Sequence, residues 1–271
     1  RLEGPTSGNV LLRRAQHTQS MDTVFALGIA RACVAGKVRN ARQVLLRGAR
    51  DSRSEADAAA LTRGAQDLAA TLRALPDAGD LDVLRGLEGE AARQYFDRQP
   101  LLVKADLRPV FSMDGRTRRP PRDRMNALLS FLYSMWMNDC RSALESVGLD
   151  PQVGFLHVLR PGRAALALDL MEEFRSFADR LALSLVNRQQ VQEDDFIVST
   201  GGSVSLKPDA RKAVVVAFQE RKQEGVQHPV LKQALPLGLV PLVQARLMAR
   251  AIRLESDESG LVTGYLPFLV R

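Results

Sequence analysis

The sequence has few cysteines, few aromatic residues and no long apolar run. Its 271 residues include only two cysteines, Cys33 and Cys140, which excludes a disulfide scaffold and indicates a reducing compartment. Only 5% of the residues are aromatic, so contacts to phosphates are expected more than the stacking of single-stranded bases. No apolar run reaches the roughly 20 residues of a membrane span, and the start does not resemble a signal peptide. We therefore expect a cytoplasmic protein with no membrane partner.

Positive charge is in excess. The chain has 38 Lys and Arg residues against 31 Asp and Glu, a net charge of +7. Most of these cations are Arg, whose planar guanidinium binds phosphate through two parallel hydrogen bonds. The excess favours a polyanionic partner, although an Arg-rich genome would produce the same composition without any such function.

Helical signals dominate the chain, and we predict a mainly α fold with one small β-hairpin. Apolar residues recur at helical spacing from residue 9 to about residue 50. Ser54, Asp80 and Asp123 are each placed to cap a helix that follows, and Gly148 is placed to end the last of these. The hairpin is predicted over residues 196–206, where two alternating segments flank Gly201 and Gly202. Further helices are predicted over residues 166–188, 209–224 and 236–255, with loops over 101–121 and 150–163.

One glutamate lies on an apolar helical stripe. Apolar residues recur at helical spacing around Glu88, from Leu84 to Tyr95. Its carboxylate is therefore drawn toward the core, where it needs a cation, a donor or a metal. An internal ion pair with an arginine is the alternative. The same helix contains Gly86 and Gly89, each costing roughly 1 kcal/mol relative to Ala, which indicates that another backbone or a ligand approaches closely.

Two acids in the segment LALDLMEEFRSF share one helix face. Asp169 and Glu172 are three positions apart, and carboxylates this close repel each other unless a cation lies between them. Mg²⁺ and Mn²⁺ prefer such oxygen ligands. The alternative is a solvated acidic face whose charges are balanced by Arg175 and Arg180.

His157 precedes this helix and is flanked by apolar residues, so it is either a ligand or a core histidine. Together with Glu88, Asp169 and Glu172 it forms a candidate site for one hard divalent cation. Zinc is less expected, because the two cysteines lack the spacing of zinc ligands.

Five sequence blocks follow one another in the order and spacing of a known family. They are GNVLLRRAQH, LEGEAARQYF, RRPPRDRMNALLSFLYS, GLDPQVGFLH and ALDLMEEFRSFADRLALSLVNR. Across residues 5–271 they resemble the CRISPR-associated adaptation integrase and endonuclease, the Cas-one family, in versions from type I systems. The family carries an N-terminal β-domain before a helical catalytic domain. We therefore expect residues 1–8 to be a remnant of that β-domain or a linker, and residues 9–271 to form the helical catalytic domain.

The resemblance implies a metal site and a reaction on DNA. The family's metal ligands correspond to Glu88, His157 and Glu172, with Asp169 as a fourth catalytic residue, and Glu172 stands where many members have Asp. The implied cofactor is Mg²⁺ or Mn²⁺. The implied reaction is phosphoryl transfer from a 3′-hydroxyl, which inserts short DNA fragments into a CRISPR array, with hydrolysis as a side reaction. Because a metal-bound His is neutral, we expect activity to fall as the pH falls.

The resemblance also implies partners: double-stranded and branched DNA, a second copy of the chain in a homodimer, and the small Cas-two protein.

Glu90 and Glu173, which neighbour the motif positions, are not expected to belong to the catalytic site. The cations that we expect to contact the DNA backbone are Arg13, Arg14, Lys37, Arg39, Arg42 and the run from Arg116 to Arg124.

Two alternatives keep the basic surface without catalysis. In a non-catalytic helical DNA-binding module, the acids and the histidine would form internal salt bridges. In a plain helical interaction protein, the charge would reflect genome composition. Neither predicts a divalent ion at Glu88, His157 and Glu172, and either would leave DNA intact.

Overall fold

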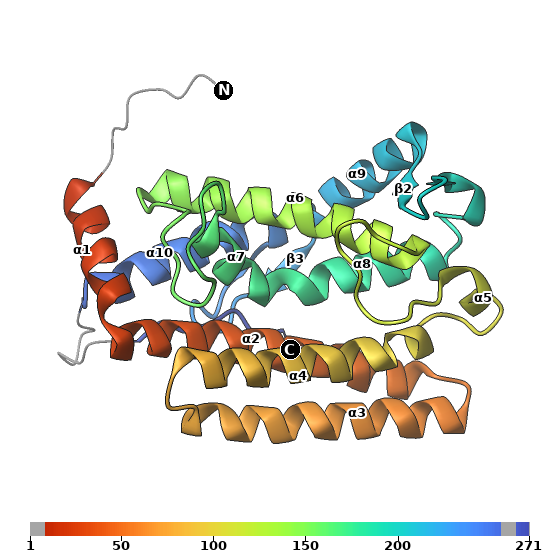
Figure 1. The fold of residues 1–271 in the computed structure, drawn as a ribbon, viewed down its shortest axis with the longest axis horizontal. Helices are drawn as coiled ribbons and strands as arrows, with labels where there is room; N and C mark the ends of the chain where they lie inside the picture. The colour runs from red at the N-terminus through yellow and green to blue at the C-terminus, as the bar shows by residue number, and fades with distance from the viewer. Residues whose placement is uncertain (1–8, 256–263, 271) are drawn as a thin grey trace.

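The computed structural model describes residues 9–255 and 264–270. The prediction for residues 1–8 therefore lies outside the described residues. The described part is mainly α-helical, as predicted, with short antiparallel hairpins (Figure 1). Its α-helices are α1 (Val10–Met21), α2 (Thr23–Asp51), α3 (Glu55–Ala74), α4 (Leu81–Arg98), α5 (Arg108–Phe111), α6 (Arg124–Val147), α7 (Ala165–Met171), α8 (Arg175–Asn187), α9 (Pro208–Gln223) and α10 (Val240–Ile252).

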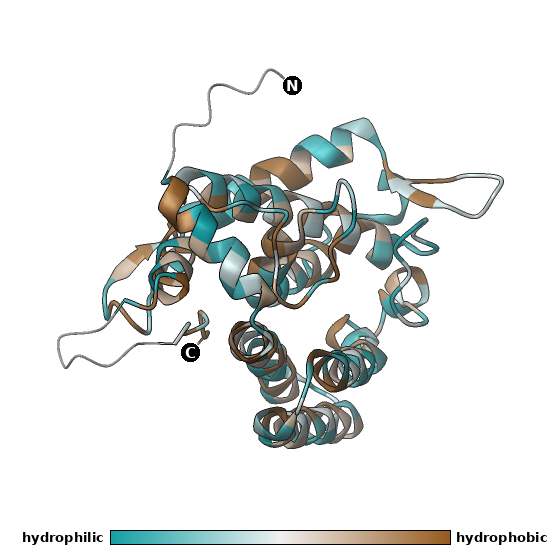
Figure 2. Ribbon diagram, turned by 60° about the vertical axis from the view of Figure 1, so that its left-hand side comes forward, coloured by the Kyte–Doolittle hydropathy of each residue, from teal (hydrophilic) through white to brown (hydrophobic). Residues whose placement is uncertain are grey.

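The helices form two layers. In one layer α2, α3 and α4 pack against one another, and Figure 2 shows these three nearly end-on. In the other layer α6 packs against α7, α8 and α10. The long helix α2 also contacts α7, α8 and the 3₁₀ turn η3 (Glu172–Phe174), so it joins the two layers.

Side chains at the helix ends explain where the helices begin. Asp22, Ser54, Asp80 and Asp123 each accept a hydrogen bond from a backbone N–H in the first turn of α2, α3, α4 and α6. These bonds satisfy N–H groups that have no partner inside the helix. Gly148, with φ +90°, ends α6 in the left-handed conformation that glycine adopts without strain. The boundaries predicted from Ser54, Asp80, Asp123 and Gly148 are confirmed.

Two predicted helices are interrupted. The segment from residue 9 to residue 50 breaks at Asp22, whose extended backbone ends α1 and caps α2. The helix predicted over residues 166–188 is divided into α7, η3 and α8. This break matters for the site, because the tighter turn η3 begins at Glu172.

The predicted hairpin is present, with β1 (Phe196–Val198) paired to β2 (Val204–Leu206). A second hairpin, β3 (Gly225–Gln227) with β4 (Ala234–Pro236), was not predicted. Its strands are as short as those of the first hairpin, but residues 228–233 between them contain no glycine pair to mark a turn. Because β4 and the 3₁₀ turn η5 (Leu237–Leu239) follow, α10 begins later than the predicted residue 236.

Two further short helices lie in the region predicted as a loop over residues 101–121. They are the 3₁₀ turn η2 (Gln99–Leu102) and the single-turn helix α5. Proline occupies one of the first positions of each, which is where its missing N–H costs least.

An aromatic cluster in the core supports the turn that carries Glu172. Trp136 on α6 stacks on Phe174 with ring centroids 5.3 Å apart, and it meets Phe218 on α9 edge-on at 5.2 Å. Phe268, from the last described segment, stacks on Phe174 at 6.2 Å. Such contacts are each worth about 1 kcal/mol beyond the area they bury, so Phe174 of η3 is held by Trp136 and by Phe268. Among the described residues, no helix combines the length and apolar character needed to cross a membrane.

Candidate active site

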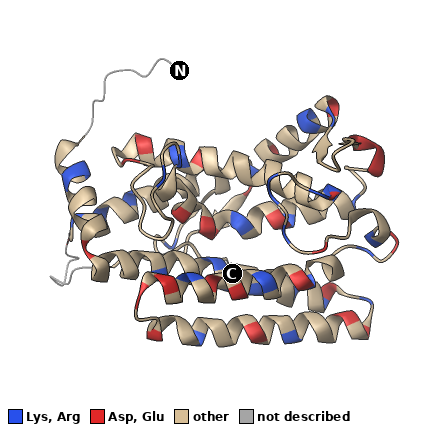
Figure 3. Cartoon of the chain, in the orientation of Figure 1, with Lys and Arg blue, Asp and Glu red and all other residues tan. Residues whose placement is uncertain are grey.

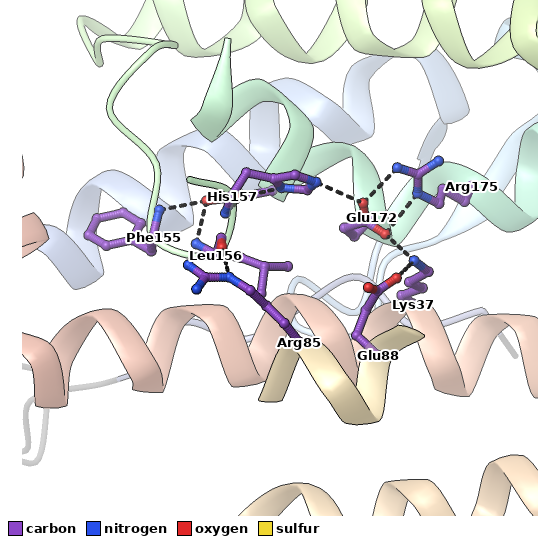
Figure 4. Close-up of polar contacts among 9 residues, drawn as sticks. Lys37, Arg85, Glu88, Phe155, Leu156, His157, Glu172 and Arg175 are labelled. Carbon is purple, nitrogen blue, oxygen red and sulfur yellow. Dashed lines mark hydrogen bonds and ion pairs between the residues drawn. The ribbon is translucent and has the colours of Figure 1, made fainter. Parts of the chain in front are cut away.

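Four predicted site residues lie where the two helical layers meet. Glu88 projects from α4, while Asp169 and Glu172 lie at the end of α7 and the start of η3. His157 lies in the loop between α6 and α7 and points toward Glu172 (Figure 4). Helices that are far apart in sequence therefore bring these side chains into one region.

Asp169 is fully buried and organises the histidine loop. Its Oδ2 accepts hydrogen bonds from the backbone N–H groups of Phe155 at 2.6 Å and Leu156 at 3.0 Å. Its Oδ1 accepts from the backbone N–H of His157 at 3.0 Å and lies 2.6 Å from the ring Nδ1 of the same residue. Because each oxygen of Asp169 already has two hydrogen-bonding partners, little of the carboxylate is left to bind a metal. In this structure Asp169 turns inward to the loop, and a cation shared by Asp169 and Glu172 stays a prediction.

Gly154 allows this close approach. A Cβ at this position would lie 2.7 Å from Asp169 Oδ2 and 2.7 Å from the carbonyl carbon of Ala165. Only a residue without a side chain leaves the carboxylate room to reach the loop N–H groups.

Two other helices hold the loop in place. Gln16 on α1 is buried, and its Nε2 donates to the carbonyl oxygens of Asp150 and Val153, each at 2.8 Å. Arg85 on α4 donates from Nε to the carbonyl oxygen of Leu156 at 2.8 Å (Figure 4). The histidine loop is thus bound to α1 and to α4, and Arg85 lies one helical turn before Glu88.

Glu172 is 2% exposed and is surrounded by positive charge. Arg175 binds it through two hydrogen bonds of 2.7 Å, and the Nζ of Lys37 lies 2.8 Å from its Oε2. His157 Nε2 is 3.8 Å from its Oε1. Burial alone would raise the pKa of Glu172, but the charges of Arg175 and Lys37 outweigh burial and hold it well below its ordinary value. Glu172 is therefore ionised at any pH in ordinary use.

Glu88 is half-buried and forms an ion pair with Lys37 (Figure 4). The apolar stripe correctly predicted that its carboxylate turns inward and meets a cation. The close approach expected at Gly86 and Gly89 is not found, because nothing lies within 4 Å of a Cβ built at either position. Instead, a cavity of about 280 Å³ borders Glu88, and Gly89, Arg116 and Arg118 are among the residues that line it.

The donor set fits a divalent cation in its chemistry. The ammonium of Lys37 lies between the carboxylates of Glu88 and Glu172. The Nε2 of His157 lies 3.8 Å from the other oxygen of Glu172, Oε1. Hard divalent cations take such oxygen and imidazole ligands. In the part of the chain that the structure describes, no three acidic, histidine or cysteine side chains are arranged to hold an ion as they stand. The charge at the centre of the donor set comes from Lys37 instead.

The neighbouring acids have other partners. Glu90 is exposed and pairs with Arg93. Glu173 is fully buried and turns away from Glu172, toward the last described segment, where its Oε2 accepts from the backbone N–H of Phe268 at 2.7 Å. Burial raises the pKa of Glu173 to about 7, although hydrogen bonds from Tyr265, Phe268 and Gln244 act in the opposite direction.

Sequence comparison decides the family. A profile of the family described as CRISPR associated protein Cas1 matches residues 1–220. The chain belongs to the Cas1 family. It is 55% identical to a Moorella thermoacetica protein named CRISPR-associated endonuclease Cas1 1, over all of this chain and 77% of the relative. It is 43% identical to CRISPR-associated endonuclease Cas1 of Leptospira interrogans, over 96% of this chain and 99% of the relative. These Cas1 relatives confirm the predicted family and the prediction of an endonuclease.

Solved structures share the fold. A Cas1 protein of Thermotoga maritima superposes with a TM-score of 0.78 at 24% identity, covering 93% of this chain and 74% of that one. A casposase bound to integration product gives a TM-score of 0.80 at 24% identity, covering 95% and 69%. A chain of a Cas6-RT-Cas1–Cas2 complex gives 0.78 at 27% identity, covering 95% and 27%.

Three members of this site were not predicted to belong to it. The sequence predicts Arg175 only as a charge that balances a solvated acidic face, and Lys37 only as a contact to DNA. It predicts no role for Arg85. The only sequence signal for Arg175 was its position three residues after Glu172. No sequence signal indicated Lys37, because the packing of the two helical layers, which brings it to Glu88 and Glu172, is made by residues far apart in sequence.

The predicted basic surface is only partly free. Figure 3 shows that positively and negatively charged residues alternate along α3 and α4. Of the cations expected to contact DNA, Arg42 donates to the carbonyl oxygen of Ala65, and Arg124 pairs with Glu193. Those that are exposed are Arg14, Arg39, Arg118, Arg119 and Arg122.

Proposed function

We propose that this Cas1 protein is a metal-dependent DNA endonuclease and integrase whose metal is held by Glu88, His157 and Glu172. The observation that carries the proposal is that Glu172 on η3 lies next to both other donors. It shares the ammonium of Lys37 with Glu88 of α4, and its Oε1 lies 3.8 Å from Nε2 of His157 in the histidine loop. The bound cofactor would be Mg²⁺ or Mn²⁺, and residues 9–271 would form the catalytic domain.

A divalent ion at this site would polarise the scissile phosphate and stabilise the negative charge of the transition state. Asp169 prepares the histidine for this role. Because Asp169 Oδ1 lies 2.6 Å from Nδ1, the ring carries its proton on Nδ1 and turns the lone pair of Nε2 toward Glu172. A carboxylate partner of this kind fixes the orientation of the ring, so we assign Asp169 a positioning role.

Arginine side chains beside the site would hold the DNA. Arg116 and Arg118 line the cavity that borders Glu88, so a strand that enters there would bring a phosphate close to the carboxylates. Contacts of this kind position the backbone without reading the bases and weaken as salt rises. The attacking group would be the 3′-hydroxyl of a short DNA fragment during insertion into a CRISPR array, or water during cleavage.

We propose double-stranded and branched DNA as substrates, and the Cas2 protein and a second copy of the chain as partners. The Cas2 partner is supported by the fold shared with a chain of a Cas6-RT-Cas1–Cas2 complex. Both cysteines are buried and unpaired, which fits a reducing compartment, and we propose the cytoplasm.

The non-catalytic DNA-binding module is a second candidate, and one observation favours it. Glu88 and Glu172 form internal ion pairs with Lys37 and Arg175 in this structure, as that alternative requires. The relatives named endonucleases, at 55% and 43% identity, favour catalysis over this candidate.

Strand transfer and cleavage of labelled branched DNA test the choice. The parent chain, Glu88→Ala and His157→Ala would be compared in Mn²⁺ and in EDTA, with Glu90→Ala as control, since Glu90 is exposed on the same helix and pairs only with its neighbours. We expect products that require Mn²⁺ and fall by roughly 100-fold or more in Glu88→Ala and His157→Ala, but not in Glu90→Ala. Products that persist in both variants would contradict the assignment, and DNA binding without products would favour the non-catalytic module.

A further inference from the structure

Lys37 is an internal residue of the site and not a surface cation. It lies on α2 with 11% of its side chain exposed, and its ammonium bridges Glu88 on α4 and Glu172 on η3. The ammonium of Lys37 thereby links the two carboxylates. Its charge therefore offsets the repulsion between them.

Both carboxylate oxygens of Glu172 are already bound by its cationic neighbours. Arg175 binds both oxygens, Oε2 through Nε and Oε1 through Nη2, and Lys37 shares Oε2. A divalent ion that uses this carboxylate would have to replace one of the two cations. A divalent ion and a cationic side chain of the protein would therefore compete for the carboxylate of Glu172.

The surroundings indicate which cation gives way. Arg175 is held twice, by its bidentate pair with Glu172 and by the ring of Tyr133, whose centroid lies 4.9 Å from the guanidinium carbon. Lys37 contacts the acids only through its terminal ammonium, at the end of a flexible four-carbon chain. Releasing Lys37 leaves Arg175 and the backbone of η3 in place.

We infer that Lys37 is a displaceable internal counter-ion that competes with the divalent metal for Glu88 and Glu172 and so lowers the affinity of the site for metal. This inference rests on the proposed function, because it concerns the same donors. In the metal-free protein the ammonium neutralises the acids and keeps them ordered. When the ion binds, the ammonium leaves both carboxylates.

Mn²⁺ binding in the absence of DNA tests the inference without measuring activity. Free Mn²⁺ would be followed by electron paramagnetic resonance for the parent chain, Lys37→Met, Lys37→Gln and Lys37→Arg. Arg31→Met is the matched control, since Arg31 lies on the same helix and donates to the carbonyl oxygen of Ala78. We expect about tenfold or tighter binding in Lys37→Met and Lys37→Gln, because the competing charge is gone. Lys37→Arg and Arg31→Met should remain within about threefold of the parent.

Thermal unfolding gives a second readout. Without metal, Lys37→Met should unfold at a lower temperature than the parent, because Glu88 and Glu172 lose their shared counter-ion. Mn²⁺ should then raise its unfolding temperature by more than it raises that of the parent.

The outcomes separate the two claims. If the parent binds Mn²⁺, Glu88→Ala abolishes binding, and Lys37→Met binds no more tightly than the parent, the competition is disproved while the metal site stands. Weaker binding in Lys37→Met and Lys37→Gln would also overturn it, because Lys37 would then support the site. If neither the parent nor any variant binds Mn²⁺, the proposed function fails and the inference fails with it.

Discussion

The carboxylate of Asp169 holds His157 at two points, since Oδ1 accepts from the backbone N–H at 3.0 Å and lies 2.6 Å from the ring Nδ1. The other oxygen binds the two preceding N–H groups. One buried side chain therefore sets both the path of the loop and the orientation of the ring. This relationship explains how a loop can present a ligand with a defined tautomer.

Replacing this carboxylate tests its positioning role. In Asp169→Asn one acceptor oxygen becomes an amide donor, so the contacts to the ring and to the loop cannot all be kept. We expect the affinity for Mn²⁺ to fall by about 10- to 100-fold, while Glu88, His157 and Glu172 remain present. Titration of Mn²⁺ by electron paramagnetic resonance would measure this, with circular dichroism to show that the helices persist. Unchanged affinity in a folded variant would rule out the role assigned to Asp169.

A methyl group at Gly154 should disturb the same loop from the opposite side. Its Cβ would lie 2.7 Å from Asp169 Oδ2 and 2.8 Å from the backbone nitrogen of Leu166. We expect Gly154→Ala to lower the free energy of unfolding by about 1–3 kcal/mol and to weaken Mn²⁺ binding. Gly89→Ala is the control: it lies inside α4 with nothing within 4 Å, and should stabilise the protein by about 0.5–1 kcal/mol. Equal effects of the two substitutions in urea denaturation would refute this prediction.

The buried acid Asp179 should make stability depend on pH. Burial raises the pKa of Asp179 to about 6, although a hydrogen bond from the hydroxyl of Tyr133, at 2.5 Å, acts in the opposite direction. In the unfolded chain an Asp loses its proton near pH 4, so the folded state loses stability relative to the unfolded state as the pH rises from about 4 through 6.

Asp179→Asn removes this titration. Relative to the parent, the free energy of unfolding of the variant should rise by about 2 kcal/mol between pH 4 and pH 7.5. Urea denaturation at the two pH values would measure the difference, with the exposed residue Asp209 changed to Asn as control. A difference between Asp179→Asn and the parent that does not change with pH would show that Asp179 keeps an ordinary pKa.

Local signals predicted much of the fold. Capping by Ser54, Asp80 and Asp123 places helix starts because each bond is made within three residues of the cap. The break at Glu172 was not predicted, since η3 is held by contacts from Trp136 and Phe268, which are distant in sequence. The hairpin β3–β4 was missed because residues 228–233, which join its strands, lack a glycine pair like the one that marks the turn between β1 and β2.

For the site, the motif positions correctly marked the residues that meet but not what each one contacts. Two acids three positions apart were expected to face one cation. Instead, the change from α7 to η3 directs Glu172 to Lys37 and Arg175, while Asp169 turns to the loop. That distinction depends on Gly154 and on the loop path, which no periodicity in the sequence reports.

The most direct measurement is anomalous diffraction from a crystal of this protein soaked in Mn²⁺, with data collected at the manganese absorption edge. We predict one strong peak bounded by the carboxylates of Glu88 and Glu172 and by Nε2 of His157, with the ammonium of Lys37 withdrawn from both acids. A soaked crystal with no peak at these three residues, in which Lys37 still bridges Glu88 and Glu172, would contradict the proposed metal site.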